Sequence, residues 1–427
     1  MTIRQWAERL DHPEVDRTIV GLHVADTMAA FLAGRNTAEG RALAGLCRHD
    51  AAASERAAMI AGIARLTECD DIHLGSCITP GAIVVPVALA LCRECGDDDF
   101  LRAVTAGYEA GITMGKAIGG AKALPVGCWP TLFAAPVMAA VTAASAKGES
   151  AETVAHAIAL ALAGSASRIG RPTGAPSGRW YLLAEAVGRG MHAAYAAGQG
   201  FRGDISLLTK SWLGMHAGHG DVDLRVFEDF SVGSGIHETG FKPFAAARQA
   251  VNAILAFQHL LPEIADIGRI EQVSISVPAI NMALLTRSFV AGDRLSALSN
   301  LACQIAWAAL RPEKLYDVAR SDAPDDEVLA FAQKVSVMPD AALDAYLPHA
   351  WGAKVGITVN GIQVDRVLIR TPFDMHGGDL RQLLVAKWKN LLSPDDLTLL
   401  LRRGEADEWY APPPLWAAAA RALHGTN

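Results

Sequence analysis

The chain has 427 residues, of which 51% are hydrophobic and 19% are charged, so it is long and apolar enough to bury the cores of two domains. Its formal net charge is -7, and it has no basic stripe that would displace counterions from phosphates, which argues against a nucleic-acid partner. The seven cysteines are an odd number, and residues 1–16 carry mixed charge in place of a secretory pattern. We therefore expect a cytoplasmic protein with reduced thiols.

Helical periodicity dominates the first 240 residues. Apolar residues recur at helical spacing over residues 15–34, and alanine-rich segments follow after polar breaks. Further helices are predicted over residues 41–47, 54–66, 81–95, 100–118, 131–146, 152–166 and 179–198. Because alanine lets helix axes approach closely, this pattern predicts a tightly packed all-helical domain, with no strand before residue 265.

An uncharged run over residues 123–146 raises the question of a membrane span. Pro125, Pro130 and Pro136 interrupt the run, and alanine rather than leucine or isoleucine dominates its second half. A buried helix is the better interpretation, so we expect no membrane partner.

The pattern changes after residue 242. One more helix is predicted over residues 246–261, and residues 269–277 then alternate between apolar and polar side chains, as a half-buried strand does. Other predicted elements are helices at 295–310 and 326–334, and strands at 334–338, 353–359 and 363–370. Asn360-Gly361, between the last two strands, is a two-residue hairpin signal, and Ser393-Pro394 begins a final helix.

These segments predict a mainly α fold with two parts. A large all-helical domain is formed by residues 1–240 with 376–427, and a smaller α+β domain covers residues 241–375. Clefts between two such domains are common places for a binding site.

The stretch around which the chain is organised is a polar loop. Asp70 and Asp71 precede a histidine and several small residues up to Gly81, and an uncharged segment at 82–91 follows without a break. A carboxylate pair at the mouth of a buried helix is unfavourable unless hydrogen bonds, cations or a ligand satisfy it, so the loop is a candidate site. The alternative is that one aspartate caps the turn and that His73 is an ordinary loop histidine.

Several collinear motifs resemble the MmgE/PrpD family. The aspartate pair with its polar loop and Pro80-Gly81 turn is one, and the others are Ala106-Gly107-Tyr108-Glu109, Gly127-Cys128-Trp129-Pro130-Thr131, Gly240-Phe241-Lys242-Pro243-Phe244 and a strand that ends in Pro339-Asp340. The family includes 2-methylcitrate dehydratase, cis-aconitate decarboxylase and iminodisuccinate epimerase. The resemblance implies a helical domain with a smaller α+β lid, and a homodimeric, cofactor-free enzyme that acts on small polycarboxylates.

The resemblance also assigns roles to individual residues. Proton abstraction next to a carboxylate needs a base, and cations that stabilise the developing enolate. Lys242 matches the lysine of the family's FKPY segment and is expected to bind a carboxylate or to act as the base; the alternative is a hinge lysine that faces water. Asp70 and Asp71 match the family's aspartate pair.

Several positions depart from the family pattern. Thr79 and Trp129 stand where the family has histidines, and neither side chain can transfer protons near neutral pH. Arg179 replaces the family's lysine, and arginine binds carboxylates well but is a poor base. Cys303 aligns near the family's tyrosine, whereas His73 is the remaining histidine of the loop and a substitute base.

The predicted site therefore has two groups of residues. The catalytic residues are Lys242, His73, Asp71 and Thr79, and the substrate-binding residues are Arg179, Asp70, Trp129, Thr131, Cys303 and Lys116. No metal is expected, because Cys92 and Cys95 have redox or zinc spacing without a second pair, and His216 and His219 have no nearby cysteine. The resemblance to the family implies that there is no cofactor. The expected function is that of a lyase or isomerase acting on a small carboxylated substrate. The alternatives are a non-catalytic member that binds an anionic ligand, and a member whose pocket accepts an apolar one.

Overall fold

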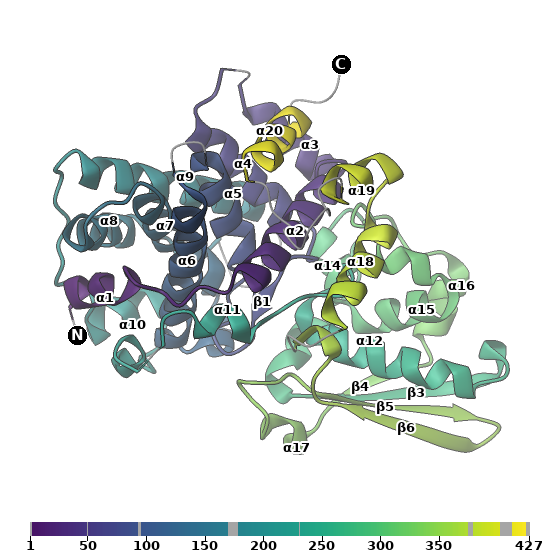
Figure 1. Cartoon of the computed structure of the whole chain (residues 1–427). Helices are drawn as coiled ribbons and strands as arrows, with labels where there is room; N and C mark the ends of the chain where they lie inside the picture. Colours follow the sequence, from purple (N-terminus) through teal and green to yellow (C-terminus); the bar gives the residue numbers. More distant parts are fainter. Residues whose placement is uncertain are drawn as a thin grey trace. The chain divides into compact units, whose positions relative to one another are not determined.

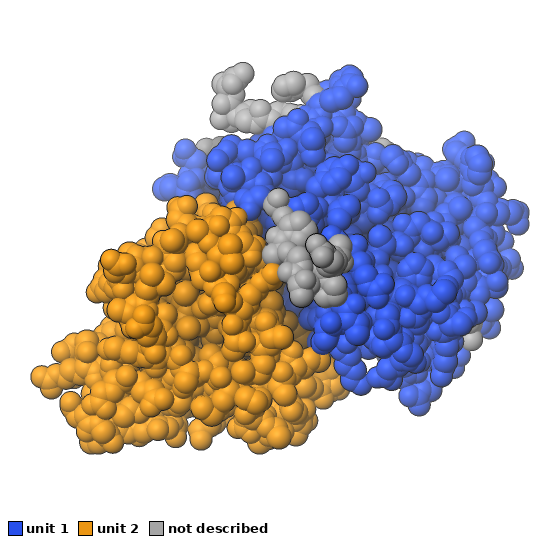
Figure 2. All heavy atoms as spheres, turned by 180° about the vertical axis from the view of Figure 1, so that it is seen from behind, with its two compact units in different colours: residues 1–241, 392–427 blue, residues 242–391 orange. Residues whose placement is uncertain are grey.

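The computed structural model describes residues 2–48, 50–92, 95–169, 178–229, 231–374, 379–401 and 412–423. The chain divides into two compact units, drawn in different colours in Figure 2. Residues 1–241 and 392–427 make up the first, which we call the helical unit, and residues 242–391 make up the second, which we call the α+β unit. The sequence pattern places these boundaries at residues 240 and 375, and helix α18 (Leu380–Leu391) belongs to the α+β unit.

The helical unit is a bundle built around two buried helices (Figure 1). Every residue of α5 (Gly81–Leu91) is buried, and so is nearly every residue of α7 (Pro130–Ala146). The other helices of this unit are α1 (Ile3–Leu10), α2 (Arg17–Gly34), α3 (Ala38–Leu46), α4 (Ala53–Arg65), α6 (Asp97–Ala117), α8 (Ala151–Ala163), α9 (Gly178–Gly198), α10 (Lys210–Ala217), α11 (Ser234–Glu238), α19 (Pro394–Leu401) and α20 (Pro412–Leu423). Alanine is the commonest buried side chain of α7, which lets α6 and α9 pack closely against it.

Helix starts in this unit follow the capping rules of the sequence. Asp16 accepts hydrogen bonds from the backbone of Thr18 and Ile19 at the start of α2. Ser393 accepts from the backbone of Asp396, so α19 begins where the serine–proline pair predicts. Across the described ranges, no helix combines the length and the apolar character needed to cross a membrane.

The helical unit also contains a small sheet, so the prediction of no strand before residue 265 is wrong. Strand β1 (Ile72–His73) pairs antiparallel with β2 (Thr239–Gly240), with Ile72 opposite Gly240 and His73 opposite Thr239. Each strand has only two residues, which is too short for an alternating pattern, and pairing is decided by tertiary context. The pairing attaches the loop that follows Asp70 and Asp71 to residues 239–240. These residues lie at the end of the unit's first segment, residues 1–241.

The α+β unit is a four-stranded sheet with helices on one face. Its strands are β3 (Ile270–Val277), β4 (Val335–Pro339), β5 (Ala353–Val359) and β6 (Ile362–Leu368), in the order β4-β3-β5-β6. Strands β3 and β4 are parallel, and the other neighbours are antiparallel. Its helices are α12 (Arg248–Leu260), α13 (Met282–Leu285), α14 (Arg294–Ser299), α15 (Leu301–Leu310), α16 (Asp326–Ala332), α17 (Ala341–Asp344) and α18. The core lies between the sheet and helices α12 and α15, and α12 runs along the sheet in Figure 1.

The predicted mainly α fold with a smaller α+β part is confirmed. The hairpin is confirmed as well: Asn360 and Gly361 join β5 to β6 and take φ angles of 50° and 73°. The helix predicted over residues 295–310 is instead two helices, because Asn300 turns out of α14 and its side chain accepts a hydrogen bond from the Cys303 backbone to cap α15.

Candidate functional site

The segment around the aspartate pair has an unusual backbone. Glu68 and Cys77 take φ angles of 52° and 56°, in the left-handed region that residues other than glycine rarely adopt. The His73 N–H donates to the Ile78 carbonyl at 2.8 Å and closes the loop between them. Strained residues of this kind persist only where the surrounding structure holds them, and they cluster at functional sites.

Asp71 is buried and accepts three hydrogen bonds. Nδ1 of His23 and the hydroxyl of Tyr108 lie 2.8 Å and 2.6 Å from its Oδ2, and the Gly81 N–H donates to Oδ1 at 2.9 Å. Burial, and then the charge of Asp71, hold the pKa of Tyr108 well above its usual value, so the hydroxyl stays protonated and donates. The carboxylate therefore ties α2, α6 and the start of α5 together.

Gly81 occupies the most crowded point of this network. A Cβ atom there would lie 2.6 Å from Oγ1 of Thr27 and 2.7 Å from both Oδ2 of Asp71 and the hydroxyl of Tyr108. Any larger residue would push these oxygens apart, so the Pro-Gly turn of the motif has a steric reason.

The neighbouring carboxylate, Asp70, pairs with a buried guanidinium. Nη1 of Arg65 lies 3.4 Å from Oδ1 of Asp70 and 2.7 Å from Oε1 of Glu68. Burial disfavours the charged form of Arg65, but the two carboxylates outweigh it and raise the pKa of the guanidinium. Arg65 is thus the cation that meets the charge of Asp70, and the sequence analysis does not include it in the site.

Two tryptophans enclose Arg65 and the predicted residue Arg179. The guanidinium carbon of Arg179 lies 4.7 Å from the Trp129 ring centre and 5.1 Å from that of Trp180. The corresponding distances for Arg65 are 5.6 Å and 5.9 Å, and the two rings meet edge to face at 6.1 Å. We call these four residues the Arg–Trp cluster. Cation–π contacts hold both guanidinium groups against the indoles.

His73 is hydrogen-bonded at both ring nitrogens. The Ser76 N–H donates to Nδ1 at 3.0 Å, which assigns the ring proton to Nε2, and Nε2 donates to Glu238 at 3.0 Å. Lys116 also contacts Glu238, at 3.3 Å. The hydrogen bond from His73 and the charge of Lys116 lower the pKa of Glu238 to about 2, against the effect of burial. The predicted residues His73 and Lys116 thus meet through a glutamate.

The predicted residues Thr79 and Thr131 lie together. The backbone N–H and the hydroxyl of Thr79 are each 3.3 Å from Oγ1 of Thr131, and both side chains are buried. This contact joins the end of the polar loop to the first turn of α7.

Lys242 and Cys303 belong to the α+β unit. Lys242 is its first residue and is fully buried. Cys303 lies in α15 among the apolar side chains of that unit's core, where burial raises the pKa of its thiol to about 11. A thiol in such surroundings is a poor nucleophile and packs as a small hydrophobic side chain.

Another buried acid of the helical unit is Glu109. It accepts the backbone N–H groups of Gly233 and Gly235 at 3.0 Å and 2.6 Å, just before and at the start of α11. Burial raises the pKa of Glu109 to about 7, although the two backbone hydrogen bonds act in the other direction. Because α11 carries Glu238, Glu109 anchors the segment that contacts His73.

The histidine of α10 packs against aromatic rings. His216 stacks on Phe133 at 5.4 Å between ring centres and contacts Trp212 at 4.3 Å. Within the ranges that the structure describes, no three His, Cys, Asp or Glu side chains are grouped so that they could hold a metal ion.

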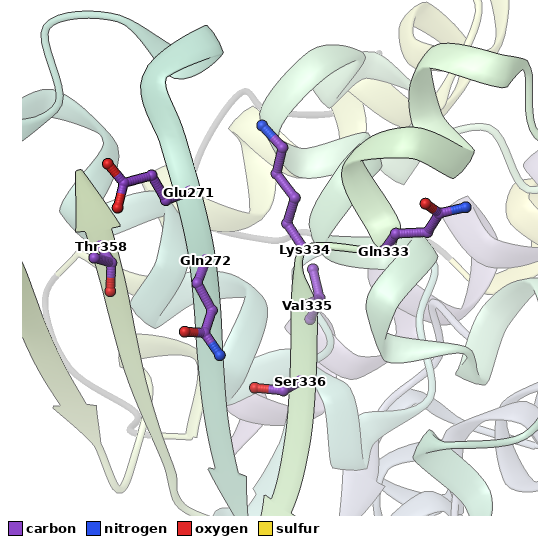
Figure 3. Close-up of a pocket in the computed structure, with 7 residues that line it drawn as sticks. All are labelled: Glu271, Gln272, Gln333, Lys334, Val335, Ser336 and Thr358. Carbon is purple, nitrogen blue, oxygen red and sulfur yellow. The ribbon is translucent and has the colours of Figure 1, made fainter. Parts of the chain in front are cut away.

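The α+β unit carries a polar depression of about 380 Å³ on its sheet (Figure 3). Its lining residues are Glu271, Gln272, Gln333, Lys334, Val335, Ser336 and Thr358. The Lys334 ammonium donates to the Ile270 carbonyl at 2.6 Å, and Glu271 lies at a register shift between β3 and β5. None of the predicted site residues lines this depression.

The predicted site lacks several residues of the network, among them His23, Arg65, Tyr108 and Trp180. His23 lies within an apolar stretch of α2, residues 19–25, so no local polar pattern distinguishes it. Tyr108 stands in the segment that resembles the family's AGYE motif, and Trp180 directly follows Arg179, so these two had a signal in the sequence.

A helical unit with a buried, charged loop, together with a separate α+β unit, defines a two-unit fold of mainly α class. The MmgE/PrpD N-terminal domain matches residues 7–225, which is just over half of the chain. The chain therefore belongs to the MmgE/PrpD family, which is generally associated with dehydratase-type lyase activity. No curated protein matches it.

Proposed function

We propose that the protein is a cofactor-free lyase or isomerase that removes a proton alpha to a carboxylate or carbonyl group of a small carboxylated substrate. Loss of a hydroxyl group as water then gives dehydration, and return of a proton to the same carbon gives epimerisation. Decarboxylation follows when a proton returns at another carbon of the enolate and a further proton replaces the CO2 that leaves. The general association of the MmgE/PrpD family with dehydratase-type lyases favours dehydration among these.

The observation that carries this proposal is the concentration of buried charge around the polar loop. Asp70, Asp71 and Arg65 are each less than a tenth exposed. Burying this much charge is unfavourable for stability, and such networks of titratable groups are typical of catalytic sites.

We assign substrate binding to the groups beside this charge. Arg179 is half-buried on the Arg–Trp cluster and would pair with a substrate carboxylate through its planar guanidinium. The hydroxyls of Thr79 and Thr131 would donate hydrogen bonds to the same substrate. Lys242 is assigned a cationic or basic role on its match to the family's lysine.

A second candidate is a family member that binds a ligand without turning it over. Both ring nitrogens of His73 are hydrogen-bonded, and the oxygens of Asp71 accept three donors. The guanidinium of Arg179 is flanked by indoles, which would suit a ligand with a flat apolar group next to its carboxylate.

One experiment separates the two. The purified protein is incubated in deuterated buffer with citrate, 2-methylcitrate, cis-aconitate or iminodisuccinate, and the acids are followed by NMR. Exchange of an alpha proton or formation of a product supports the enzyme. A rise in melting temperature without any exchange supports the binding protein.

Lys242→Met tests the lysine in the same assay. We expect exchange to fall by at least about 100-fold, because the variant keeps the length of the side chain but loses its charge and its basicity. Lys122→Met is the matched control, since that lysine is exposed and its ion-pair partner, Asp221, is exposed as well. Full activity of Lys242→Met would remove the lysine from the proposed mechanism.

A further inference from the structure

The hairpin of the α+β unit carries an Asn-Gly pair at its tip. Asn360 and Gly361 are both exposed and take φ angles of 50° and 73°. The ladder between β5 and β6 ends where Val359 pairs with Ile362, so the two turn residues lie outside it. Exposed turn tips of this kind open more readily than the strands that they join.

A carboxylate lies beside this turn. The Gly361 N–H donates to Oε2 of Glu271, with 3.4 Å between nitrogen and oxygen. Glu271 stands at the register shift of β3 against β5, between Ile270 and Gln272, and its side chain points from β3 toward the end of β5, beside Thr358 (Figure 3). Irregularities of this kind redirect a side chain out of the regular ladder. Here the redirected carboxylate meets a backbone N–H of the turn.

We propose that Asn360 is a deamidation site and that Glu271 is the general base of that reaction. The inference does not depend on the proposed function. A backbone nitrogen that loses its proton can attack the side-chain amide of the preceding asparagine. A Cβ atom at Gly361 would meet no described atom within 4 Å, so the described residues leave room for this approach. Catalytic hydrogen bonds are often long before the reacting atoms meet, and they shorten as the proton is transferred.

The proposed reaction conserves atoms and electrons. Glu271 accepts the proton of the Gly361 nitrogen, whose electron pair forms a bond to Cγ of Asn360. The bond from Cγ to Nδ2 breaks, and Nδ2 leaves as ammonia with the proton that Glu271 received. Solvent water then opens the cyclic imide at one of its two carbonyl groups. Opening at Cγ gives aspartate at position 360, and opening at the main-chain carbonyl gives isoaspartate, in which the chain runs through the former side chain.

The sequence has a single Asn-Gly pair, and two other exposed asparagines serve as comparisons. Asn36 precedes Thr37, which is branched at Cβ and whose N–H donates to the Gly34 carbonyl at 3.0 Å. Asn390 precedes Leu391, and both belong to α18. The nitrogen that would attack is therefore next to a larger side chain at both positions, and no carboxylate hydrogen bond to it occurs among the described residues.

Deamidation would change the hairpin in two ways. It places a second negative charge near Glu271, and like charges repel. Isoaspartate also adds a carbon atom to the main chain between β5 and β6, so the two-residue turn that matches the twist of the strands is lost. We expect the product to hold β6 less firmly against β5.

The first test follows Asn360 in the purified protein. The protein is incubated at neutral pH in water enriched in heavy oxygen, and its peptides are then separated and weighed by mass spectrometry. We expect a mixture of aspartate and isoaspartate at position 360 that carries the heavy oxygen, whereas Asn36 and Asn390 stay unchanged. An unconverted Asn360 overturns the proposal, and so does equal conversion of all three asparagines.

Glu271→Gln separates a base from an anchor. The glutamine can still accept the Gly361 N–H but is not basic, so we expect conversion to be at least about 10-fold slower than in the wild type. Glu313→Gln, at an exposed glutamate of the same unit, is the matched control and should keep the wild-type rate. If Glu271 only holds the turn closed, its replacement leaves the rate unchanged or raises it, and either result overturns its role as the base.

Gly361→Ala gives a second measurement. Its methyl group lies next to the attacking nitrogen and hinders the approach, so we expect slower conversion even though alanine fits the turn less well than glycine. Faster conversion in this variant would mean that opening of the hairpin alone sets the rate, and would overturn the proposed mechanism.

Discussion

The two units bury charge in different ways. In the helical unit two buried carboxylates of the polar loop meet other side chains: His23 and Tyr108 for Asp71, and Arg65 for Asp70. In the α+β unit two buried arginines donate to backbone carbonyls: Arg320 to Ala245, and Arg294 to Val318. The α+β unit also has a buried ion pair between side chains, Arg248 with Asp374, so the difference lies in the kind of group: the network of Asp71 includes a histidine and a tyrosine, whereas that pair joins an arginine to a carboxylate. Coupled titratable groups are suited to proton transfer, which is why we assign chemistry to the helical unit.

Replacing the central carboxylate should have the largest effect. Asp71→Ala leaves three buried donors without their acceptor, and we expect a loss of about 3–5 kcal/mol in the free energy of unfolding. Urea denaturation gives the value, and Asp221→Ala is the control because that carboxylate is exposed. A loss below about 1 kcal/mol would show that the network is not what holds the loop.

The corresponding change in the α+β unit breaks its buried ion pair. Nη2 of Arg248 lies 2.7 Å and 2.8 Å from the two oxygens of Asp374, and Nη1 contacts Asn252. We expect Arg248→Met to lower the free energy of unfolding by about 3 kcal/mol, because the carboxylate of Asp374 loses this cation while it keeps the neutral donors of Thr371. Native-state hydrogen exchange should show faster exchange in β3 and unchanged protection in α5. An equal loss of protection in β3 and in α5 would show that the ion pair of Arg248 and the network of Asp71 are not independent. Arg366→Met, at an exposed ion pair, is the control.

Glu109 gives a prediction that depends on pH. Burial raises its pKa from 4.5 to about 7, so the folded protein binds a proton that the unfolded chain has lost between these values. Stability from this group is therefore greatest below pH 4.5 and is lost as the pH rises to about 7. Glu109→Gln removes that loss and should stabilise the protein by about 2 kcal/mol at pH 8, with little effect at pH 4, as thermal unfolding at the two values would show. Destabilisation at pH 8 would mean that the charged form is preferred.

The smallest effect is expected at the hairpin. Gly361 has a φ of 73°, and a Cβ atom added there would meet no atom of the described residues within 4 Å, so Gly361→Ala acts through backbone conformation alone. We expect a loss of about 1 kcal/mol. The control is Gly45→Ala, in α3, which has equal space but helical backbone and should gain up to about 1 kcal/mol. Identical effects in thermal unfolding would contradict the conformational explanation.

Much of the fold follows from local patterns. The alternation over residues 269–277 corresponds to β3, and the Asn-Gly pair sets the register of β5 and β6. The break at Asn300 and the pairing of β1 with β2 were missed, because one depends on a single side-chain cap and the other on tertiary contacts between segments far apart in sequence.

The site was predictable only where its residues carry a motif. Asp70, Asp71, Thr79 and Arg179 stand in segments that resemble family motifs, but their partners Arg65 and His23 come from α4 and α2. A histidine inside an apolar helix has the appearance of a core residue in sequence. Its polar contact with Asp71 emerges only when the fold brings that carboxylate to 2.8 Å from it.

The pairing of β1 with β2 has a consequence for cooperativity. Its short ladder pairs Ile72 and His73 of the polar loop with Thr239 and Gly240, which directly precede Phe241. The two segments are therefore expected to become ordered or disordered together. Any event that separates β1 from β2 is thereby felt at His73, and the exchange rate of the amide protons in this ladder measures how often the two segments come apart.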